Sequence, residues 1–257
     1  MLRPRIIPCL LVHNGGLVKT QKFTNPKYVG DPINAVKIFN EKEVDELIVV
    51  DIDATVLGKE PNYTLIKHLA TECRMPLCYG GGVRSVEQID KIISLGVEKV
   101  ALSAAVVETP ELITLAAEVV GGQSVVAVLD VKKRRLGGRY EVMTHNATKK
   151  TGLNPVDLAK KAEDLGAGEV VINSIDQDGA MNGYDFDLIQ KVRESISLPL
   201  TVLGGAGSLQ DIESLISRFG IVGAAAGSLF VFKGVYRAVL INYPNRSEKD
   251  ALIKGNL

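Results

Sequence analysis

Five aspartates end apolar runs of the sequence, and they are the residues whose type and position could do chemistry. They are Asp51, Asp53, Asp130, Asp176 and Asp178. A carboxylate at the end of a buried strand can serve as a general acid or base when its surroundings tune its pKa, or it can cap a helix or orient a loop. We predict a catalytic role for Asp130, because the run SVVAVLD offers little else that could meet a polar ligand. For Asp51 and Asp53 we favour the structural role.

The segment 5–12, RIIPCLLV, looks like the run that ends in Asp130 but carries Leu11 near its end. A polar stretch with a glycine pair follows each run, HNGGLVKT after the first and KKRRLGGR after the second. We predict that the first strand ends at Leu11 or Val12 and gives way to a Gly-rich loop. One run therefore ends in a carboxylate and its counterpart in leucine, and this difference bears on whether the protein performs acid–base chemistry.

Two glycine pairs predict phosphate binding. Gly81-Gly82 and Gly204-Gly205 each follow an apolar run and precede a helical pattern. Glycine lets backbone amides approach a phosphate, and the helix N-terminus adds partial positive charge. Residues after two further runs can complete the sites: Ala104 and Ala105 for the first, and Ala226, Gly227 and Ser228 for the second. One such pair would more often serve tight packing, but two symmetric pairs indicate a ligand with two phosphates.

Charges of mixed sign stand at the starts of four apolar runs. They are Arg5, Glu46, Lys99 and Glu169. Any one of them alone would serve solubility. Together they could ring the axis of a barrel as a salt-bridged plug, which an uncharged small molecule such as ammonia could pass if the plug opened.

Short β-type runs alternate with amphipathic helical patterns along the chain. The runs are apolar on both faces, which predicts a parallel sheet that is covered on both sides. Eight such units close most naturally into a single (β/α)8 TIM barrel, whose active site lies at the carboxyl ends of the strands. The predicted strands are 5–12, 46–53, 76–81, 99–103, 124–131, 169–175, 199–205 and 222–227.

The chain also repeats itself, which predicts two half-barrels of about residues 1–122 and 123–257. GGVRSVEQIDKIISLG resembles GGAGSLQDIESLISRFG, so that Ser85 matches Ser208 at a spacing of 123, and Asp53 matches Asp176 at the same spacing. The segment of about residues 132–152 is too polar for a barrel helix. We predict that it forms a hairpin and loop over the top face.

The composition and charge argue against two classes of function, nucleic-acid binding and membrane association. The chain has 257 residues, and its 30 basic and 30 acidic residues cancel, so we expect no broad nucleic-acid surface. Apolar runs stay shorter than the roughly 18 residues of a membrane helix, so we expect no membrane association. Cys9, Cys73 and Cys78 lack zinc-ligand spacing, and we interpret them as reduced thiols of a cytoplasmic protein. No metal and no cofactor is expected.

Several segments together resemble the cyclase subunit of imidazole glycerol phosphate synthase over essentially the whole chain. They are RIIPCL, GGLVKT, DELIVVDI, GGGVRS, AVLDVK, GAGEVVINSIDQDG and GGAGSLQD. The resemblance implies a half-repeat barrel with a glutaminase subunit docked at its bottom. Ammonia from the glutaminase would travel along the barrel axis to a substrate with two phosphates.

The resemblance also implies roles for particular residues. These are an ammonia gate of Arg5, Glu46, Lys99 and Glu169, phosphate-binding glycines at Gly82 and Gly205, a catalytic aspartate at Asp130, a ligand-site aspartate at Asp176 and a first-loop lysine at Lys19.

The departures from the family lie at the top of the predicted barrel. The family has a second catalytic aspartate where this chain has Leu11, an Asn-Thr pair at Ser103-Ala104, and a serine at Leu203. Losing a general acid–base group typically removes about 10²- to 10⁴-fold in rate. This combination resembles a paralogue branch of surface-polysaccharide pathways, in which the barrel and a glutaminase supply ammonia to a sugar amidotransferase that makes acetamidino sugars.

Three functions are compatible with these residues. The favoured one is a non-cyclising, ammonia-conducting subunit. The second is an active cyclase-lyase of histidine biosynthesis that tolerates Leu11, and the third is a phosphosugar isomerase on the same half-barrel, although Leu11 counts against that too. The expected partners are a glutaminase subunit, a sugar amidotransferase, and a phosphorylated small molecule or phosphate ions.

Overall fold

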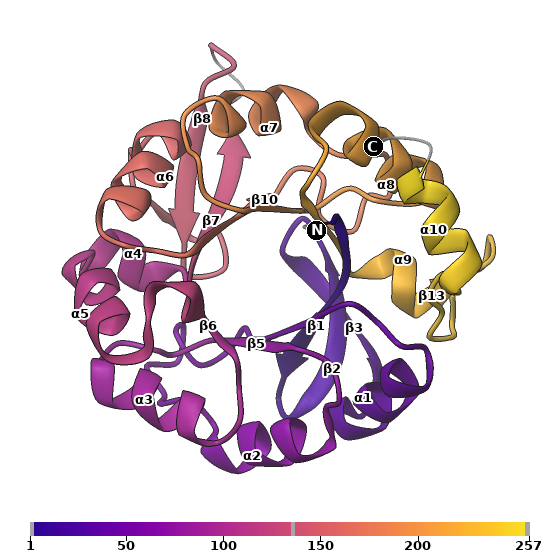
Figure 1. The fold of residues 1–257 in the computed structure, drawn as a ribbon, viewed down its shortest axis with the longest axis horizontal. Coiled ribbons are helices and arrows are strands. Elements are labelled where there is room, and N and C mark those ends of the chain that lie inside the picture. Colours follow the sequence, from indigo (N-terminus) through magenta and orange to yellow (C-terminus); the bar gives the residue numbers. More distant parts are fainter. Residues whose placement is uncertain (1–2, 135–136, 255–257) are drawn as a thin grey trace.

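Eight parallel strands close into a barrel with helices on the outside (Figure 1). The computed structural model describes residues 3–134 and 137–254. The strands follow the order β10-β11-β12-β1-β4-β5-β6-β7, and the pairing of β7 with β10 closes the barrel. They are β1 (Arg5–His13), β4 (Leu47–Asp51), β5 (Leu77–Gly80), β6 (Lys99–Leu102), β7 (Val125–Lys133), β10 (Glu169–Ser174), β11 (Leu200–Leu203) and β12 (Gly223–Ala226). The predicted single (β/α)8 barrel is confirmed.

Helices cover the outer face of the barrel. Asp31, Ser85, Asn154, Asp185 and Ser208 each accept a backbone N–H from the first turn of the following helix. The helices are α1 (Pro32–Glu41), α2 (Tyr63–Glu72), α3 (Val86–Ser94), α4 (Ala104–Glu108), α5 (Glu111–Val120), the 3-10 turn η1 (Gly122–Ser124), α6 (Pro155–Asp164), α7 (Phe186–Arg193), α8 (Leu209–Phe219), α9 (Ser228–Val231) and α10 (Arg246–Lys254). Within the described part of the chain, none of them has the length and apolar character needed to cross a bilayer.

Alternating side chains divide each barrel strand between two apolar clusters. On β1, Ile6 and Leu10 belong to the large core beneath the helices, whereas Ile7 and Cys9 belong to a separate cluster inside the barrel. The buried members of the inner cluster are Ile7, Cys9, Ile48, Cys78, Ala101, Val126, Val171 and Ala225. The middle of the barrel interior is therefore packed and apolar.

The segment after the first strand is a hairpin rather than the predicted loop. β1 continues to His13 and turns through Asn14 and Gly15, which have φ of 50° and 77°, into β2 (Gly16–Gln21). Asn-Gly favours such a two-residue turn because both residues need positive φ. β2 pairs in turn with β3 (Thr24–Gly30), so a small antiparallel sheet rises from the end of β1.

A second hairpin extends β7 within the polar segment 132–152. β8 (Tyr140–Thr144) pairs antiparallel with β7, and β9 (Lys149–Lys150) pairs with β8. Residues 135–136 of this segment lie outside the described residues, as do the outer ends of the predicted half-barrels. A short pair, β13 (Phe232–Lys233) and β14 (Ala238–Val239), follows α9.

Candidate functional site

A cavity of about 270 Å³ opens at the carboxyl ends of the barrel strands, where ligands bind in this fold. It brings most of the predicted site residues together. Its lining includes Lys19, Gly81, Ser103, Ala104, Asp130, Gly204, Gly205, Gly227 and Ser228. Leu11 also lines it, whereas Gly82 and Asp176 do not.

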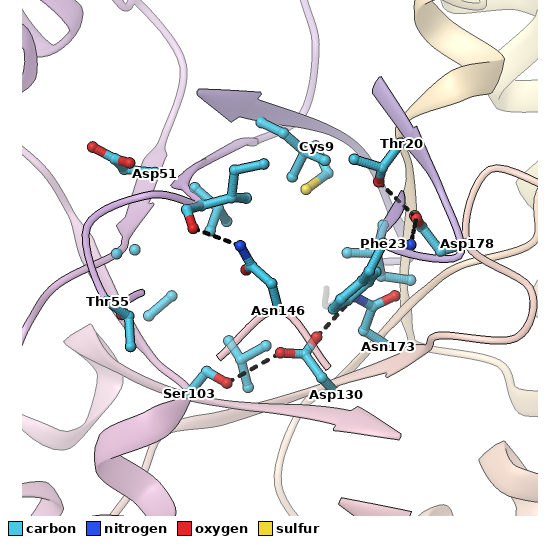
Figure 2. Close-up of a pocket in the computed structure, with 18 of the residues that line it drawn as sticks. Cys9, Thr20, Phe23, Asp51, Thr55, Ser103, Asp130, Asn146, Asn173 and Asp178 are labelled. Atoms are coloured by element: carbon cyan, nitrogen blue, oxygen red, sulfur yellow. Dashed lines mark hydrogen bonds between the residues drawn. The ribbon is translucent and has the colours of Figure 1, made fainter. Parts of the chain in front are cut away.

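Asp130 is held by two side chains, Asn173 on β10 and Ser103 directly after β6 (Figure 2). Asn173 donates through Nδ2 to Oδ1 at 2.9 Å, and the Ser103 hydroxyl donates to Oδ2 at 3.1 Å. Burial raises the pKa of Asp130 to about 6, although these two hydrogen bonds oppose the rise, and the charge of Asp178 adds to it. Asp130 thus has a pKa suited to proton transfer near neutral pH.

Leu11 occupies the place on β1 that Asp130 occupies on β7. Leu11 is in register with Val50 on β4, and Asp130 is in register with Asn173 on β10. Val50 and Asn173 are separated by 123 positions, the spacing of the sequence repeat. Leu11, like Val50, Val128 and Leu203, packs against the buried residues of the inner apolar cluster. The cavity mouth therefore has a carboxylate, Asp130, at one of the two symmetry-related positions and an aliphatic side chain, Leu11, at the other.

Lys19 is almost fully buried, with 5% of its surface exposed. β2 turns its side chain into the cavity, where Nζ donates to the backbone oxygen of Cys9. Burial lowers the pKa of Lys19, although the Cys9 thiol and Asp178 oppose this change. A side chain at Gly227 would place its Cβ only 2.7 Å from Nζ, so glycine at that position makes room for the lysine.

The two glycine turns differ. The Gly82 amide already donates to the Thr55 hydroxyl at 3.2 Å. Gly81 and Gly205 have φ of 121° and 124°, and a Cβ on either would collide with backbone. Close packing therefore requires glycine at both positions whether or not a phosphate binds. Of the two predicted phosphate-binding glycines, Gly205 lines the cavity and Gly82 does not, so Gly205 is better placed to bind a phosphate there.

The two aspartates that follow β10 lie in different places. Asp176 accepts the backbone N–H of Lys133 at 2.8 Å and lines a separate surface cleft. Asp178 lines the main cavity, where it accepts from the Thr20 hydroxyl at 2.8 Å and from the Phe23 backbone N–H at 3.3 Å (Figure 2). Asp176, to which the resemblance assigns a ligand role, thus lies outside the main cavity, whereas Asp178 lines it.

Three further cavity residues were not singled out from the sequence. Phe23 comes from the turn between β2 and β3, and Asn146 from the turn between β8 and β9, where Nδ2 donates to Ile52 O at 2.8 Å (Figure 2). Asn173 is the third inward side chain of β10 after Glu169 and Val171. Alternation along EVVINS would have indicated it, because a polar residue falls on the inward face there.

Asp51 and Asp53 hold loops. Asp51 Oδ1 accepts the backbone N–H groups of Asp53 and Ala54, at 2.9 and 3.2 Å. Asp53 Oδ1 lies 2.6 Å from His13 Nδ1, and Asp53 Oδ2 accepts the backbone N–H of Asn14 at 2.7 Å. These two contacts fix the turn between β1 and β2. These contacts fit the structural role that was favoured for both residues.

At the opposite end of the barrel, four charged side chains form a closed ring of alternating sign. Arg5 pairs with Glu46, and its Nη2 lies 2.7 Å from Glu169 Oε1. Lys99 Nζ lies 2.9 Å from Glu46 Oε1 and 2.8 Å from Glu169 Oε2. The Thr201 hydroxyl donates to Glu169 Oε1 at 2.5 Å. The ring closes the barrel at the amino ends of its strands.

The ring stabilises its own charges. Burial alone would raise the pKa of Glu169, but attraction to Arg5 and Lys99 outweighs burial and holds the pKa below its ordinary value. Burial would lower the pKa of Lys99, yet Glu169 and Glu46 raise it. Glu169 and Lys99 thus stay ionised at neutral pH. Removing one partner of such a buried network is strongly destabilising, because an uncompensated charge is left behind.

Within the described residues, no group of three or more His, Cys, Asp or Glu side chains is arranged to hold a metal ion. Cys9 and Cys78 are fully buried, and burial raises the pKa of both thiols. A buried thiol with a raised pKa is a poor nucleophile.

The fold and the site define a (β/α)8 barrel with a cavity of mixed polar and apolar lining at the carboxyl ends of its strands and an ion-paired ring at the amino ends. The chain belongs to the family described as histidine biosynthesis protein, which matches residues 5–237, and within it to the HisF-like group.

Its relatives match it almost from end to end. One from Leptospira interrogans, named "Putative imidazole glycerol phosphate synthase subunit HisF", is 60% identical over 98% of this chain and 99% of its own length. Relatives from Vibrio vulnificus and Pseudomonas aeruginosa carry the same name with the suffixes hisF3 and hisF2. They are 59% and 50% identical, each over 97% of this chain, and over 96% and 99% of their own lengths.

Proposed function

We propose that this chain is a cyclase-like barrel subunit that conducts ammonia from a glutaminase, docked at the ring end, to a sugar amidotransferase acting at the cavity end. The observation that carries the proposal is Leu11, which stands in register where the symmetric partner of Asp130 would be. The bottom of the barrel keeps its charged ring while the top keeps one of two acid–base positions.

The interior supports conduction. Above the ring, the inward side chains of β1, β7 and β10 are Ile7, Val126 and Val171, all in the inner apolar cluster. Neutral ammonia enters such surroundings far more readily than ammonium, because burying an unpaired charge is very unfavourable. The interior is thus suited to passing ammonia without its proton once the ring opens.

Leu11 argues against full cyclase activity. Cyclisation in this family uses a carboxylate on each side of the substrate, and here one side is aliphatic, with Leu11 in register with Val50. Asp130 alone cannot donate and accept protons on opposite sides of one ligand. A loss of about 10²- to 10⁴-fold is typical when one acid–base group is removed.

The suffixes hisF2 and hisF3 mark two relatives as members of numbered sets. Such a set supports a subunit whose task differs from that of the histidine-pathway enzyme.

A second candidate is an active cyclase subunit of histidine biosynthesis. It is favoured by the retained Asp130, with its pKa near neutrality, and by Lys19, Gly205 and Ser228 in one cavity. An assay of imidazole glycerol phosphate formation with the purified chain and free ammonia separates the two. The conduit proposal expects turnover far below the ordinary enzyme range of about 1 s⁻¹ or more, and turnover within that range would replace it with the second candidate.

A further inference from the structure

The hairpin of β13 and β14 carries the two most exposed large hydrophobic side chains among the described residues. Val235 is 96% exposed and Tyr236 is 95% exposed, and we call these two residues the hairpin tip. The next most exposed is Tyr28 on β3, at 67%. Isolated apolar side chains are common on protein surfaces. Tyrosine, however, is enriched among the residues that contribute most of the binding energy in protein interfaces, so a fully exposed tyrosine at a tip indicates a contact site.

The hairpin that presents this tip is held firmly. The ring of Phe232 is buried, and two cations contact it, Lys27 at 5.0 Å and Arg237 at 5.5 Å from its centroid. The backbone N–H of Arg237 donates to Gly234 O at 3.0 Å, which closes the turn. An element that is already held in one conformation loses little entropy when it binds, so the hairpin is suited to recognition.

The hairpin is also tied to the rim of the cavity. Arg237 donates through Nη2 to Gly179 O at 2.8 Å, and Gly179 lines the cavity. Lys27 Nζ, on β3, donates to Arg237 O at 3.5 Å. β3 pairs with β2, which contributes Lys19 and Thr20 to the cavity lining. A protein that binds the hairpin tip would therefore lie beside the mouth of the cavity.

The charge around the tip selects the kind of partner. Segments 16–30 and 226–247 contain no aspartate or glutamate, although the chain has 30 of these residues. Lys27, Lys233 and Arg237 therefore surround the tip with positive charge. This surface favours an acidic partner and disfavours a second copy of itself, because like charges would meet.

The size of the tip argues against a membrane. Two exposed side chains carry less apolar surface than one myristoyl chain, which by itself binds a bilayer only marginally. A protein partner can add the rest of the cavity rim to the contact, and a specific interface needs about 1,000 Å² or more. The tip is thus better suited to anchor a protein than a lipid surface.

We propose that Val235 and Tyr236 insert into an apolar pocket with an acidic rim on the sugar amidotransferase, and so hold that enzyme over the cavity mouth. This inference rests on the proposed function, because it assigns the surface by which the receiver of the ammonia docks. The glutaminase binds at the opposite end of the barrel, so the two partners do not compete.

Calorimetric titration of the full chain, in complex with its glutaminase, with the purified sugar amidotransferase tests the proposal. Tyr236→Ser alters a side chain that is 95% exposed, so the fold should be unaffected. It should raise the Kd about 30-fold, as expected for a residue that anchors an interface. Lys233→Glu should also weaken binding, and binding by the unmodified chain should weaken as the salt concentration rises.

Val119→Ser is the matched control. Val119 is a 56% exposed residue of α5, which lies on the opposite side of the barrel from β13 (Figure 1). This variant should bind the amidotransferase as the unmodified chain does. Tyr236→Ser should stimulate the glutaminase normally, because the tip is remote from the ring.

The proposal is overturned if the unmodified chain does not bind the amidotransferase, or if Tyr236→Ser binds it as tightly. Two further measurements examine other occupants. The proposal also fails if Tyr236→Ser abolishes binding to vesicles of phosphatidylserine and phosphatidylcholine, or dissociates a dimer of the chain in analytical ultracentrifugation.

Ammonia transfer is measured separately, as glutamine-dependent product formation by the assembled complex. Binding that depends on Tyr236 without any such transfer would refute the conduit and leave the docking site in place. Transfer with undiminished binding by Tyr236→Ser would refute the docking site and leave the conduit.

Discussion

Glu169 and Asn173 stand on the same inward face of β10, four residues apart, with Val171 between them. At about 3.3 Å per residue they lie about 13 Å apart along the strand. One strand thus joins the ion-paired ring to the hydrogen-bond network of Asp130. This arrangement divides the molecule into two polar ends separated by an apolar middle, and each end can be tested separately.

Lys99→Met tests the ring. The methionine keeps the length of the side chain but leaves Glu46 and Glu169 with Arg5 as their only ring cation, so the free energy of unfolding should fall by about 3 kcal/mol. Stimulation of a purified glutaminase partner by the barrel should fall as well. Chemical denaturation and a glutaminase assay measure the two effects.

Lys67→Met is the matched control, because Lys67 is an exposed lysine on α2 with no ring contact. Lys99→Arg should retain most of the stability and stimulation. Unchanged stimulation by Lys99→Met would show that the ring is not part of the contact or the passage.

The ring also predicts acid sensitivity. The folded-state pKa of Glu169 lies below its ordinary value of 4.5, so its contribution to stability is present above pH 4.5 and is lost as pH falls through the lower, folded-state pKa. The melting temperature should therefore decrease as the pH is lowered from 4.5 through the folded-state pKa of Glu169. Glu169→Gln, already destabilised at neutral pH, should flatten this part of the profile, and an unaltered profile would contradict the assignment.

Asp130 should behave in the opposite way. Its folded-state pKa is about 6, above the ordinary 3.8, so folding favours the protonated form and stability declines as pH rises between these values. Asp130→Asn removes the buried charge, its amide oxygen can still accept from Asn173, and its NH₂ group can donate to the Ser103 hydroxyl in place of the bond that Ser103 donates to Asp130. It should raise the free energy of unfolding by about 3 kcal/mol at pH 8, with little change below pH 4, as urea denaturation at the two pH values would show. Equal effects at both would indicate that charge burial is not the cause.

Some of this site was predictable from the sequence, and the limits have physical reasons. Strand alternation and apolar runs located Asp130 and the ring residues, because a strand fixes which face and which end a residue occupies. The turn after β10 is irregular, so spacing could not tell Asp176 from Asp178. The bond from Asn146 to Ile52 joins residues 94 positions apart and depends on closure of the whole barrel. Asn14-Gly15 is a signal for a two-residue hairpin turn, whereas the glycine pair by itself predicts a loop.

Anion binding should be unequal at the two glycine turns. Crystals grown in sulfate should show density beside Gly205 and Ser228, which line the cavity, and none at Gly82, whose amide already donates to Thr55. Thr55→Val would release that amide and should allow weak occupancy of the first turn. Equal density at both turns in the unmodified protein, or at neither, would contradict this expectation.

Leu11→Asp tests the reason for the missing carboxylate. The variant places an acidic group at the position on β1 that corresponds by the half-barrel repeat to Asp130 on β7. This position lines the cavity mouth, where the carboxylate can reach water, so the loss of stability should be modest. We expect a trace of cyclase activity with free ammonia where the unmodified protein has little or none. Full activity should not return, because Ser103, Ala104 and Leu203 also differ from the family and reacting groups must be placed to within about 0.5 Å.

Leu11→Asn is the matched control, since it has the shape of aspartate without its acid–base function. A steady-state assay of all three proteins decides the matter: unmodified protein turning over at about 1 s⁻¹ or more would show that Leu11 is compatible with cyclisation and that the barrel is a histidine-pathway enzyme.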